Sequence, residues 1–272
     1  MRGTAAIKRT LDILELLASS SGERHLSGIT RMLGLPKSST HRMLLTLEDC
    51  GYLQRDDRTG RYYFGFKLFC LASTAIARTD LRIQASAMLY KLMQDTALTV
   101  HMAIPTGNHA LLIEKIDPPQ PKRITTYVGC AMEFHSSALG KALLANFTQP
   151  VIAAFQKSPQ PRYTDNTITM GAELRQQLAE IRRQGYAVDD EEQMVGYRCI
   201  GAPVFDLTGS VIAAISVAGT TDQIHGGNIG AISSQVVRCA SQISSRLNVP
   251  PGSADLSKAQ PPIALKPVSS LT

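Results

Sequence analysis

The stretch GLPKSSTHRMLLTLEDCGYL, residues 34–53, constrains what this chain can fold into more than any other part of the sequence. Gly34 suits the end of a short helix that Ser27 begins as an N-cap, because glycine readily takes the left-handed conformation found after helices. Pro36 suits the start of the next helix, because a proline there sacrifices no hydrogen bond. Two short helices joined by a turn of about three residues have the spacing of a helix-turn-helix.

A hairpin is expected directly after this helix pair. Its candidate strands, YLQRDD and RYYFGF, contain several aromatic residues, and the intervening run DDRTG ends in glycine. A further helix is expected before the pair, over residues 6–18, where apolar residues recur at helical spacing. These elements predict a winged helix-turn-helix domain over residues 5–66, followed by a linker helix over residues 67–80.

The helix that begins at Pro36 is expected to have one buried and one exposed side. On a helical wheel Leu44 and Leu47 share a stripe about 100° wide with Thr40 and Met43. The opposite side begins with hydroxyls and continues with an arginine one turn later; hydroxyls bind phosphates, and arginine pairs with guanine. The residues predicted to contact DNA are Lys37, Ser38, Ser39, Thr40, His41, Arg42 and Thr46 of this helix, with Arg58 and Arg61 on the hairpin turn.

The charge balance favours a polyanionic partner. The formal charge is +6, and the first 80 residues hold 12 Lys and Arg against 8 Asp and Glu, so this smaller part carries +4 of it. The five cysteines are scattered without a C-x-x-C pair, which indicates neither a disulfide framework nor a zinc site and fits a reducing cytoplasm. No apolar run of about 20 residues predicts a membrane-spanning helix. We therefore expect a cytoplasmic protein without a metal or cofactor.

Short strand and helix patterns alternate over residues 81–248, which predicts an α/β domain and an α+β chain. The expected strands are LTVHMAIPTG, HALLIEKID, KRITTYVG, AMEFHSS, YAVDDEE, YRCIGAPVFD and SVIAAISVAGT. The expected helices are LRIQASAMLYKLMQDTA, SSALGKALLANF, GAELRQQLAEIRRQG and NIGAISSQVVRCASQISSRL. The tail, residues 249–272, is rich in Pro and Ser and is expected to be disordered.

Three motifs in the second domain raise the alternative of a small-molecule enzyme with an accessory winged helix. The acidic run 189–192 suits a metal or an acid–base pair, but such runs are usually solvated, and neighbours on a strand point to opposite faces. His135 precedes Ser136 and Ser137, yet no G-x-S-x-G elbow surrounds these serines. The GK at 140–141 lacks the upstream glycine of a phosphate-binding loop. A winged helix used for protein contacts is the other alternative.

The segment LSGITRMLGLPKSSTHRMLLTLEDCGYLQRDDRTGRYYFGFKL resembles the DNA-binding domain of the isocitrate lyase regulator (IclR) family of bacterial transcription factors. HSSALGKALLA and GYAVDDEEQMVGYRCIGAPVFDLTGSVIAAISVAGT resemble the effector-domain signatures of the same family. The resemblance implies a winged helix joined by a linker helix to a GAF-like α/β domain that binds a small molecule. It also implies a repressor or activator, not an enzyme, that binds a palindromic double-stranded DNA operator as a homodimer or a dimer of dimers.

The same resemblance implies where the effector binds. In this chain, the family's pocket corresponds to four places: the turn before GKALLA, an aspartate before the paired glutamates of DDEE, the cysteine of the strand that contains RC, and the strand after it. Amides at the start of a helix attract a carboxylate. Because Ala218 replaces a serine found in some relatives and Leu139 lies at the turn, we expect a carboxylate with a hydrophobic or aromatic body. The residues expected to bind it are Ala138, Leu139, Asp189, Cys199, Ser216 and Ala218.

Overall fold

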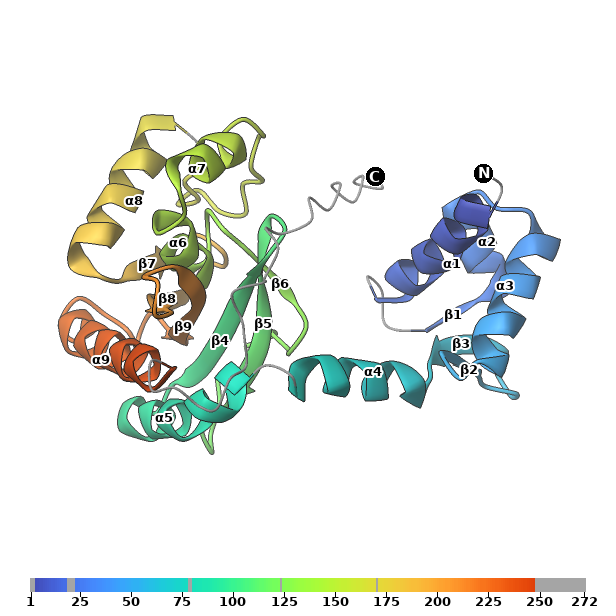
Figure 1. The fold of residues 1–272 in the computed structure, drawn as a ribbon, viewed down its shortest axis with the longest axis horizontal. Helices are drawn as coiled ribbons and strands as arrows, with labels where there is room; N and C mark the ends of the chain where they lie inside the picture. The colour runs from blue at the N-terminus through green and yellow to red at the C-terminus, as the bar shows by residue number, and fades with distance from the viewer. Residues whose placement is uncertain (1–2, 19–22, 78–79, 123, 170, 248–272) are drawn as a thin grey trace. The chain divides into compact units, whose positions relative to one another are not determined.

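The computed structural model describes residues 3–18, 23–77, 80–122, 124–169 and 171–247 (Figure 1). The chain divides into two compact units, Met1–Thr79 and Asp80–Thr272. Each unit buries its own apolar side chains, so each has its own hydrophobic core. The tail for which disorder is expected, residues 249–272, lies outside the described residues.

The first unit combines a helix-turn-helix with a small antiparallel sheet. Its elements are α1 (Gly3–Ala18), β1 (Glu23–His25), α2 (Leu26–Leu33), α3 (Lys37–Asp49), β2 (Leu53–Arg55), β3 (Arg61–Phe64) and α4 (Phe66–Ala77). The helix-turn-helix and the β2–β3 hairpin confirm the sequence prediction. The strand β1 was not expected; it is three residues long and pairs with β3, so the strand order is β1-β3-β2.

The turn between α2 and α3 depends on Gly34. Its φ of 60° is left-handed, and its N–H donates to the carbonyl oxygen of Thr30. Pro36 takes the cap position at the start of α3 in an extended conformation. Ser27 is not the N-cap of α2 as expected: it lies inside the helix, and His25 occupies the cap position without a side-chain hydrogen bond.

The second unit is built on a six-stranded sheet with the order β6-β5-β4-β9-β8-β7, in which every neighbouring pair is antiparallel. This mixed architecture confirms the expected α/β domain. Its elements are α5 (Asp80–Thr96), β4 (Thr99–Thr106), β5 (His109–Ile116), β6 (Ala131–Glu133), α6 (Ala138–Ala145), α7 (Gln149–Phe155), α8 (Gly171–Gln184), β7 (Ala187–Asp190), β8 (Tyr197–Phe205), β9 (Val211–Thr220) and α9 (Ile229–Leu247).

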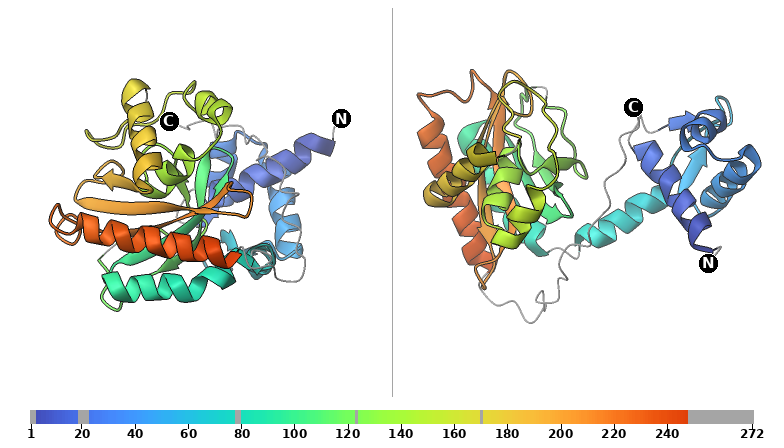
Figure 2. Two further views of the ribbon diagram at one scale, coloured as in Figure 1. Left: turned by 60° about the vertical axis from the view of Figure 1, so that its left-hand side comes forward. Right: turned by 90° about the horizontal axis from the view of Figure 1, so that it is seen from above.

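Helices cover both faces of this sheet (Figure 2). On one face α5 and α9 pack against strand residues such as Val100, Ile200 and Val217. On the other face α6 and α8 pack against small strand residues such as Ala103 and Ala214. Side chains alternate between faces along a strand, so every second residue of the central strands faces α6.

The segment KRITTYVG, residues 122–129, was expected to be a strand, and apart from residue 123 the structure shows it as loop and turn. Side chains of the sheet hold it instead. Lys115 donates from Nζ to the carbonyl oxygen of Ile124 at 3.2 Å, and Nε2 of His101 lies 2.8 Å from Oγ1 of Thr126. By strand alternation His101 and Lys115 face α6, so this loop crosses the α6 side of the sheet.

Candidate DNA-binding surface and effector site

The helix α3 has one side in the core of the first unit. Leu44 is fully buried, Leu47 nearly so, and Met43 is half-buried. Thr40 is also fully buried, and its hydroxyl donates to the carbonyl oxygen of Pro36 at 3.1 Å. Thr40 was expected among the DNA contacts, and this expectation is wrong. Its position one turn before Leu44 places it on the packing side of the helix.

The opposite side of α3 is open to solvent. Arg42 and Thr46 lie there one turn apart, and the Thr46 hydroxyl donates to the carbonyl oxygen of Arg42 at 2.9 Å. Ser39 is half-buried at the margin of this side. The first-turn N–H groups of a helix have no intrahelical partner, so they add an anion-binding end to the surface. We call this surface the α3 face; its exposed residues are Lys37, Ser38, His41, Arg42 and Thr46.

The hairpin places its two predicted arginines differently. Arg58 is exposed on the turn, where Oδ1 of Asp56 accepts the N–H groups of Arg58 at 2.8 Å and Thr59 at 2.9 Å. These backbone hydrogen bonds, that of Thr59 first, lower the pKa of Asp56. Arg61 is not on the turn as expected: it is the first residue of β3, and its Nε lies 3.4 Å from Nε2 of His25. Only Arg58 therefore lies at the tip.

The predicted effector residues of the sheet lie side by side on the α6 face. Strand pairing places Asp189 beside Cys199 and Cys199 beside Ala218. Two residues further along β8, Gly201 lies beside Ser216. Directly paired residues of antiparallel strands point to the same face, and alternate residues of β7 and β9 pack against α6. The tertiary structure thus gathers side chains from three strands at one place.

The helix α6 begins directly over these side chains. Ser137 caps it, accepting the N–H of Gly140 at 3.0 Å. Gly201 permits the close approach, because a Cβ at that position would lie 2.7 Å from the carbonyl oxygen of Ala138 and 3.2 Å from the nitrogen of Leu139. The start of α6 therefore lies against β8 beside the strand residues. We call the combined set the effector cluster: Ala138, Leu139, Asp189, Cys199, Ser216 and Ala218.

A buried ion pair joins α6 to the turn that follows β7. Lys141 is fully buried; its ammonium binds Oε1 of Glu192 and donates to the carbonyl oxygen of Val188 at 2.5 Å. Asp189 is anchored in the same turn, where its Oδ1 accepts the N–H groups of Glu192 at 2.9 Å and Gln193 at 3.3 Å. These contacts join α6 to the end of β7 and the turn after it, beside the effector cluster.

Burial shifts the ionisation of the groups in and around the effector cluster. It raises the pKa of Asp189 to about 7, although the neighbouring ammonium of Lys141 acts in the opposite direction. It also raises the pKa of Glu192, again opposed by Lys141. The Cys199 thiol has its pKa raised well above the ordinary value by burial and by Asp189. His101 has its pKa lowered to about 4, chiefly by burial.

Sequence reasoning missed the buried ion pair. The acidic run 189–192 was interpreted as solvated, and this is wrong for Asp189 and Glu192, which are 4% and 3% exposed. The alternation argument holds in part, since Asp190 between them is exposed and pairs with Arg198. Lys141 was considered only as part of a nucleotide loop. A lysine inside the otherwise apolar helix ALGKALLA was the signal that could have indicated a buried partner.

The serines near His135 have structural roles. Ser137 caps α6, and the Ser136 hydroxyl donates to Oε1 of Gln193 at 3.0 Å. The Nε2 atom of His135 lies 2.8 Å from the carbonyl oxygen of Pro161, so the ring is turned to the backbone and not to either serine. This geometry lacks the nucleophile–base hydrogen bond of a catalytic triad.

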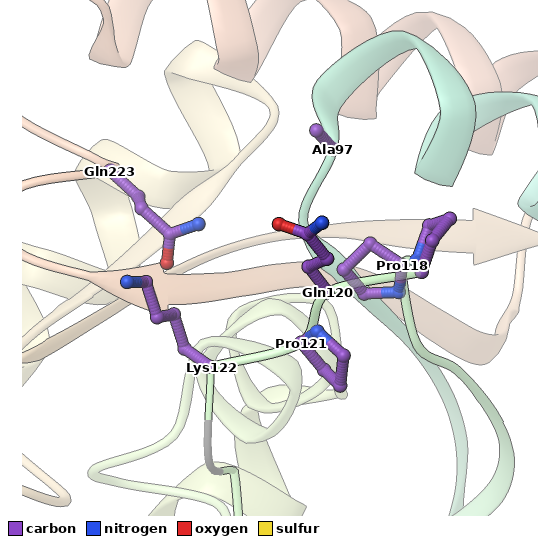
Figure 3. A pocket seen from close by; sticks show the side chains of 7 residues that line it. Ala97, Pro118, Gln120, Pro121, Lys122 and Gln223 are labelled. Carbon is purple, nitrogen blue, oxygen red and sulfur yellow. The ribbon is translucent and has the colours of Figure 1, made fainter.

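Open cavities of the second unit lie apart from the effector cluster. One of about 600 Å³ is lined by a proline-rich wall and by Gln120, Lys122 and Gln223 (Figure 3). Another of about 360 Å³ lies among residues of α8, β8 and α9. Neither cavity is lined by a residue of the effector cluster. Five residues of the cluster are buried, and Cys199 is half-buried.

Among the described residues, no three His, Cys, Asp or Glu side chains are grouped so that they would hold a metal ion. None of the helices in the described part of the chain has the length and apolarity needed to cross a membrane.

Two family models match the chain. The IclR helix-turn-helix domain matches residues 6–57, and the bacterial transcriptional regulator IclR C-terminal domain matches residues 73–245. Together they cover the α3 face and the whole effector cluster.

Similar proteins and structures support this match. The HTH-type transcriptional regulator BhcR of Paracoccus denitrificans is 35% identical over 243 residues, 89% of this chain and 87% of that protein. The crystal structure of the Thermotoga maritima IclR has a TM-score of 0.74 and 28% identity, covering 90% of this chain and 99% of that one. An IclR homologue from Microbacterium hydrocarbonoxydans, crystallised with 4-hydroxybenzoate, has a TM-score of 0.79 and 24% identity. The match covers 89% of this chain and 98% of that one. This protein belongs to the IclR family of bacterial transcriptional regulators: it is a DNA-binding regulator and not an enzyme.

Proposed function

We propose that the α3 face reads a double-stranded DNA operator, and that the effector cluster binds a small carboxylate that changes this binding. The observation that carries the first part is the orientation of α3. Leu44, Leu47 and Thr40 are buried, which leaves the polar groups of the α3 face free on the other side of the helix. A helix presented in this way can enter the major groove.

The residues of the α3 face have different tasks in this proposal. Arg42 contacts a guanine, because its guanidinium can bind O6 and N7 together. Ser38 and Thr46 add hydroxyl contacts to bases or phosphates, and Lys37 and His41 lie near the phosphates. Arg58 at the hairpin tip extends the contact to the backbone or the minor groove.

The operator is palindromic, because the protein binds it as a homodimer or a dimer of dimers. Exposed apolar side chains of the first unit support self-association. Phe66 and Phe69 lie one turn apart on α4 and are 78% and 70% exposed, and Ile7 and Leu11 on α1 are 63% and 52% exposed. Such patches are uncommon on monomers and are covered when two copies associate. A two-fold dimer presents two α3 faces to two half-sites.

The effector is a carboxylate with an apolar or aromatic body. The start of α6 supplies N–H groups to the carboxylate, and Ser216 supplies a further hydroxyl. Leu139 and Ala218 give the remainder of the site an apolar lining. The compound crystallised with the Microbacterium homologue, 4-hydroxybenzoate, has this chemistry and is therefore a suitable probe.

The DNA part of the proposal is tested by fluorescence anisotropy with duplexes selected from a random library. We expect a palindromic consensus and an affinity that falls steeply with salt, because phosphate contacts release counterions. Sedimentation of the free protein should give a dimer or tetramer. A protein that stays monomeric and binds no duplex in dilute buffer would overturn this part.

The effector part is tested by calorimetric titration with 4-hydroxybenzoate, benzoate, glyoxylate and pyruvate. We expect the aromatic carboxylates to bind more tightly and to change operator affinity, since a ligand shifts an equilibrium only by its differential affinity for the two states. Preferential binding of glyoxylate or pyruvate would overturn the aromatic assignment.

A further inference from the structure

The effector cluster and its neighbours carry one negative charge in excess when both of their carboxyl groups are ionised. The ammonium of Lys141 on α6 is paired with the carboxylate of Glu192 in the turn after β7. Asp189, at the end of β7, is the second carboxyl group and is 4% exposed. No ion pair joins Asp189 to a Lys, Arg or His side chain in the described part of the chain.

The other strands that face the cluster add no compensating positive charge. His101 of β4 is neutral near pH 7, because burial lowers its pKa to about 4. Lys115 of β5 has its own partner, with its Nζ 3.2 Å from Oδ2 of Asp117. Cys199 of β8 is a neutral thiol, because burial raises its pKa. An anionic effector would therefore meet a like charge in a buried site, where such a charge is costly.

We propose that a carboxylate effector enters the effector cluster together with one proton from solvent, that Asp189 carries this proton, and that protonated Asp189 donates a hydrogen bond to the effector. The inference rests on the proposed effector site. Proton uptake leaves Lys141 and Glu192 as a neutral pair, and the effector becomes the only uncompensated anion. It then lies beside the start of α6, whose N–H groups favour negative charge.

Asp189 is better placed than Glu192 to carry the proton. Oε1 of Glu192 binds the ammonium of Lys141, which favours the ionised carboxylate. Oδ1 of Asp189 accepts two backbone N–H groups, so we assign the proton to Oδ2, which has no backbone donor among the residues that the structure describes. Burial already raises the pKa of Asp189 to about 7, so its protonated form is accessible at neutral pH. The free protein is therefore poised to accept a proton when the anion arrives.

The test is calorimetric titration of the full-length protein with 4-hydroxybenzoate and with pyruvate in Tris and in HEPES, whose ionisation enthalpies differ. The difference between buffers gives the number of protons taken up per bound effector. We expect about 0.9 proton at pH 8 and about 0.1 at pH 6, with affinity about tenfold lower at pH 8. All three values follow from a group that is half-protonated near pH 7 in the free protein and fully protonated in the complex.

Two substitutions locate the proton. Asp189→Asn keeps the shape and the Oδ1 acceptor, so it should bind the same probe with no proton uptake and with equal affinity at both pH values. Asp190→Asn changes the exposed neighbour that pairs with Arg198 and should behave as the wild type. The wild-type proton count decides the matter even if Asp189→Asn does not fold.

The possible outcomes separate this inference from the proposed function. Binding of either carboxylate without proton uptake, or with uptake that persists in Asp189→Asn, would overturn the inference and leave the effector class intact. Absence of binding by both carboxylates from pH 6 to pH 8 would overturn the carboxylate site itself, and the inference with it.

Discussion

The α3 face and the effector cluster both gather hydroxyls and charged groups, but one is solvated and the other is buried. On the α3 face, Arg42 and Lys37 need no protein partner, because both are exposed and water solvates them. In the second unit, Lys141 and Glu192 are paired because an isolated buried charge is costly. Substitutions on the α3 face should therefore affect DNA binding alone, whereas substitutions around the effector cluster should also affect folding.

Lys141→Met should have the largest effect. It removes the ammonium from Glu192 and leaves a buried carboxylate without its partner, which should lower the free energy of unfolding by about 3–5 kcal/mol. Urea denaturation of the full chain at pH 7 measures this change. Lys91→Met is the matched control, because it breaks an exposed pair with Asp95 and should leave stability unaltered. Equal stability of Lys141→Met and the wild type would remove the distinction between the two regions.

Asp189→Asn should raise stability at alkaline pH. The pKa of Asp189 is raised on folding from 3.8 to about 7, so the folded state favours the neutral acid. The wild type therefore loses stability as pH rises through this window, by up to about 4 kcal/mol, whereas the variant does not. Urea midpoints of the two proteins should coincide near pH 4 and diverge by pH 8. A constant difference at all pH values would show that Asp189 does not titrate in this range.

Gly201→Ala should disturb the contact between β8 and α6. The added Cβ would lie 2.7 Å from the carbonyl oxygen of Ala138, so α6 must shift, at a cost of about 1–3 kcal/mol. Thermal unfolding and titration with 4-hydroxybenzoate should both report the change, while operator affinity of the effector-free protein stays the same. Gly230→Ala in α9, where the new Cβ meets open space, is the control. A stable Gly201→Ala variant with normal effector binding would contradict the packing described above.

Arg42→Ala should have the smallest effect on folding and a clear effect on DNA. We expect operator affinity to fall by about 1–3 kcal/mol, with discrimination relaxed at one base position. Unfolding by urea should be unaltered, because Arg42 is exposed. Arg175→Ala, an exposed arginine of the second unit, serves as the control for loss of a single positive charge. An unchanged footprint and affinity in Arg42→Ala would show that the α3 face does not contact bases.

Local signals account for the parts of the fold that were predicted correctly. Gly34 and Pro36 mark a turn through their own backbone preferences, and the leucine spacing orients α3. The strand β1 was missed because it consists of three residues and exists only through pairing with β3, far along the chain. Residues 122–129 have a strand-like composition, yet side chains of Lys115 and His101 hold this segment across the sheet.

The effector cluster, too, was predicted only in part from the sequence. The motif resemblance indicated Ala138, Asp189 and Cys199, and strand pairing then placed Asp189 and Cys199 side by side. The charge state of the cluster was not predictable, because Lys141 and its partner Glu192 are 51 residues apart. Composition alone favours a solvated acidic run, since burial is a property of the folded chain.

The sequence by itself determined that this protein has a helix-turn-helix whose second helix has one polar, exposed side, because turn residues and helical periodicity act over a few neighbouring residues. Only the tertiary structure decided that Thr40 packs inwards and that Lys141, Asp189 and Glu192 share one buried site. The physical reason is that solvation and ionisation depend on every group that surrounds a side chain, and the groups around these carboxyls come from distant parts of the chain.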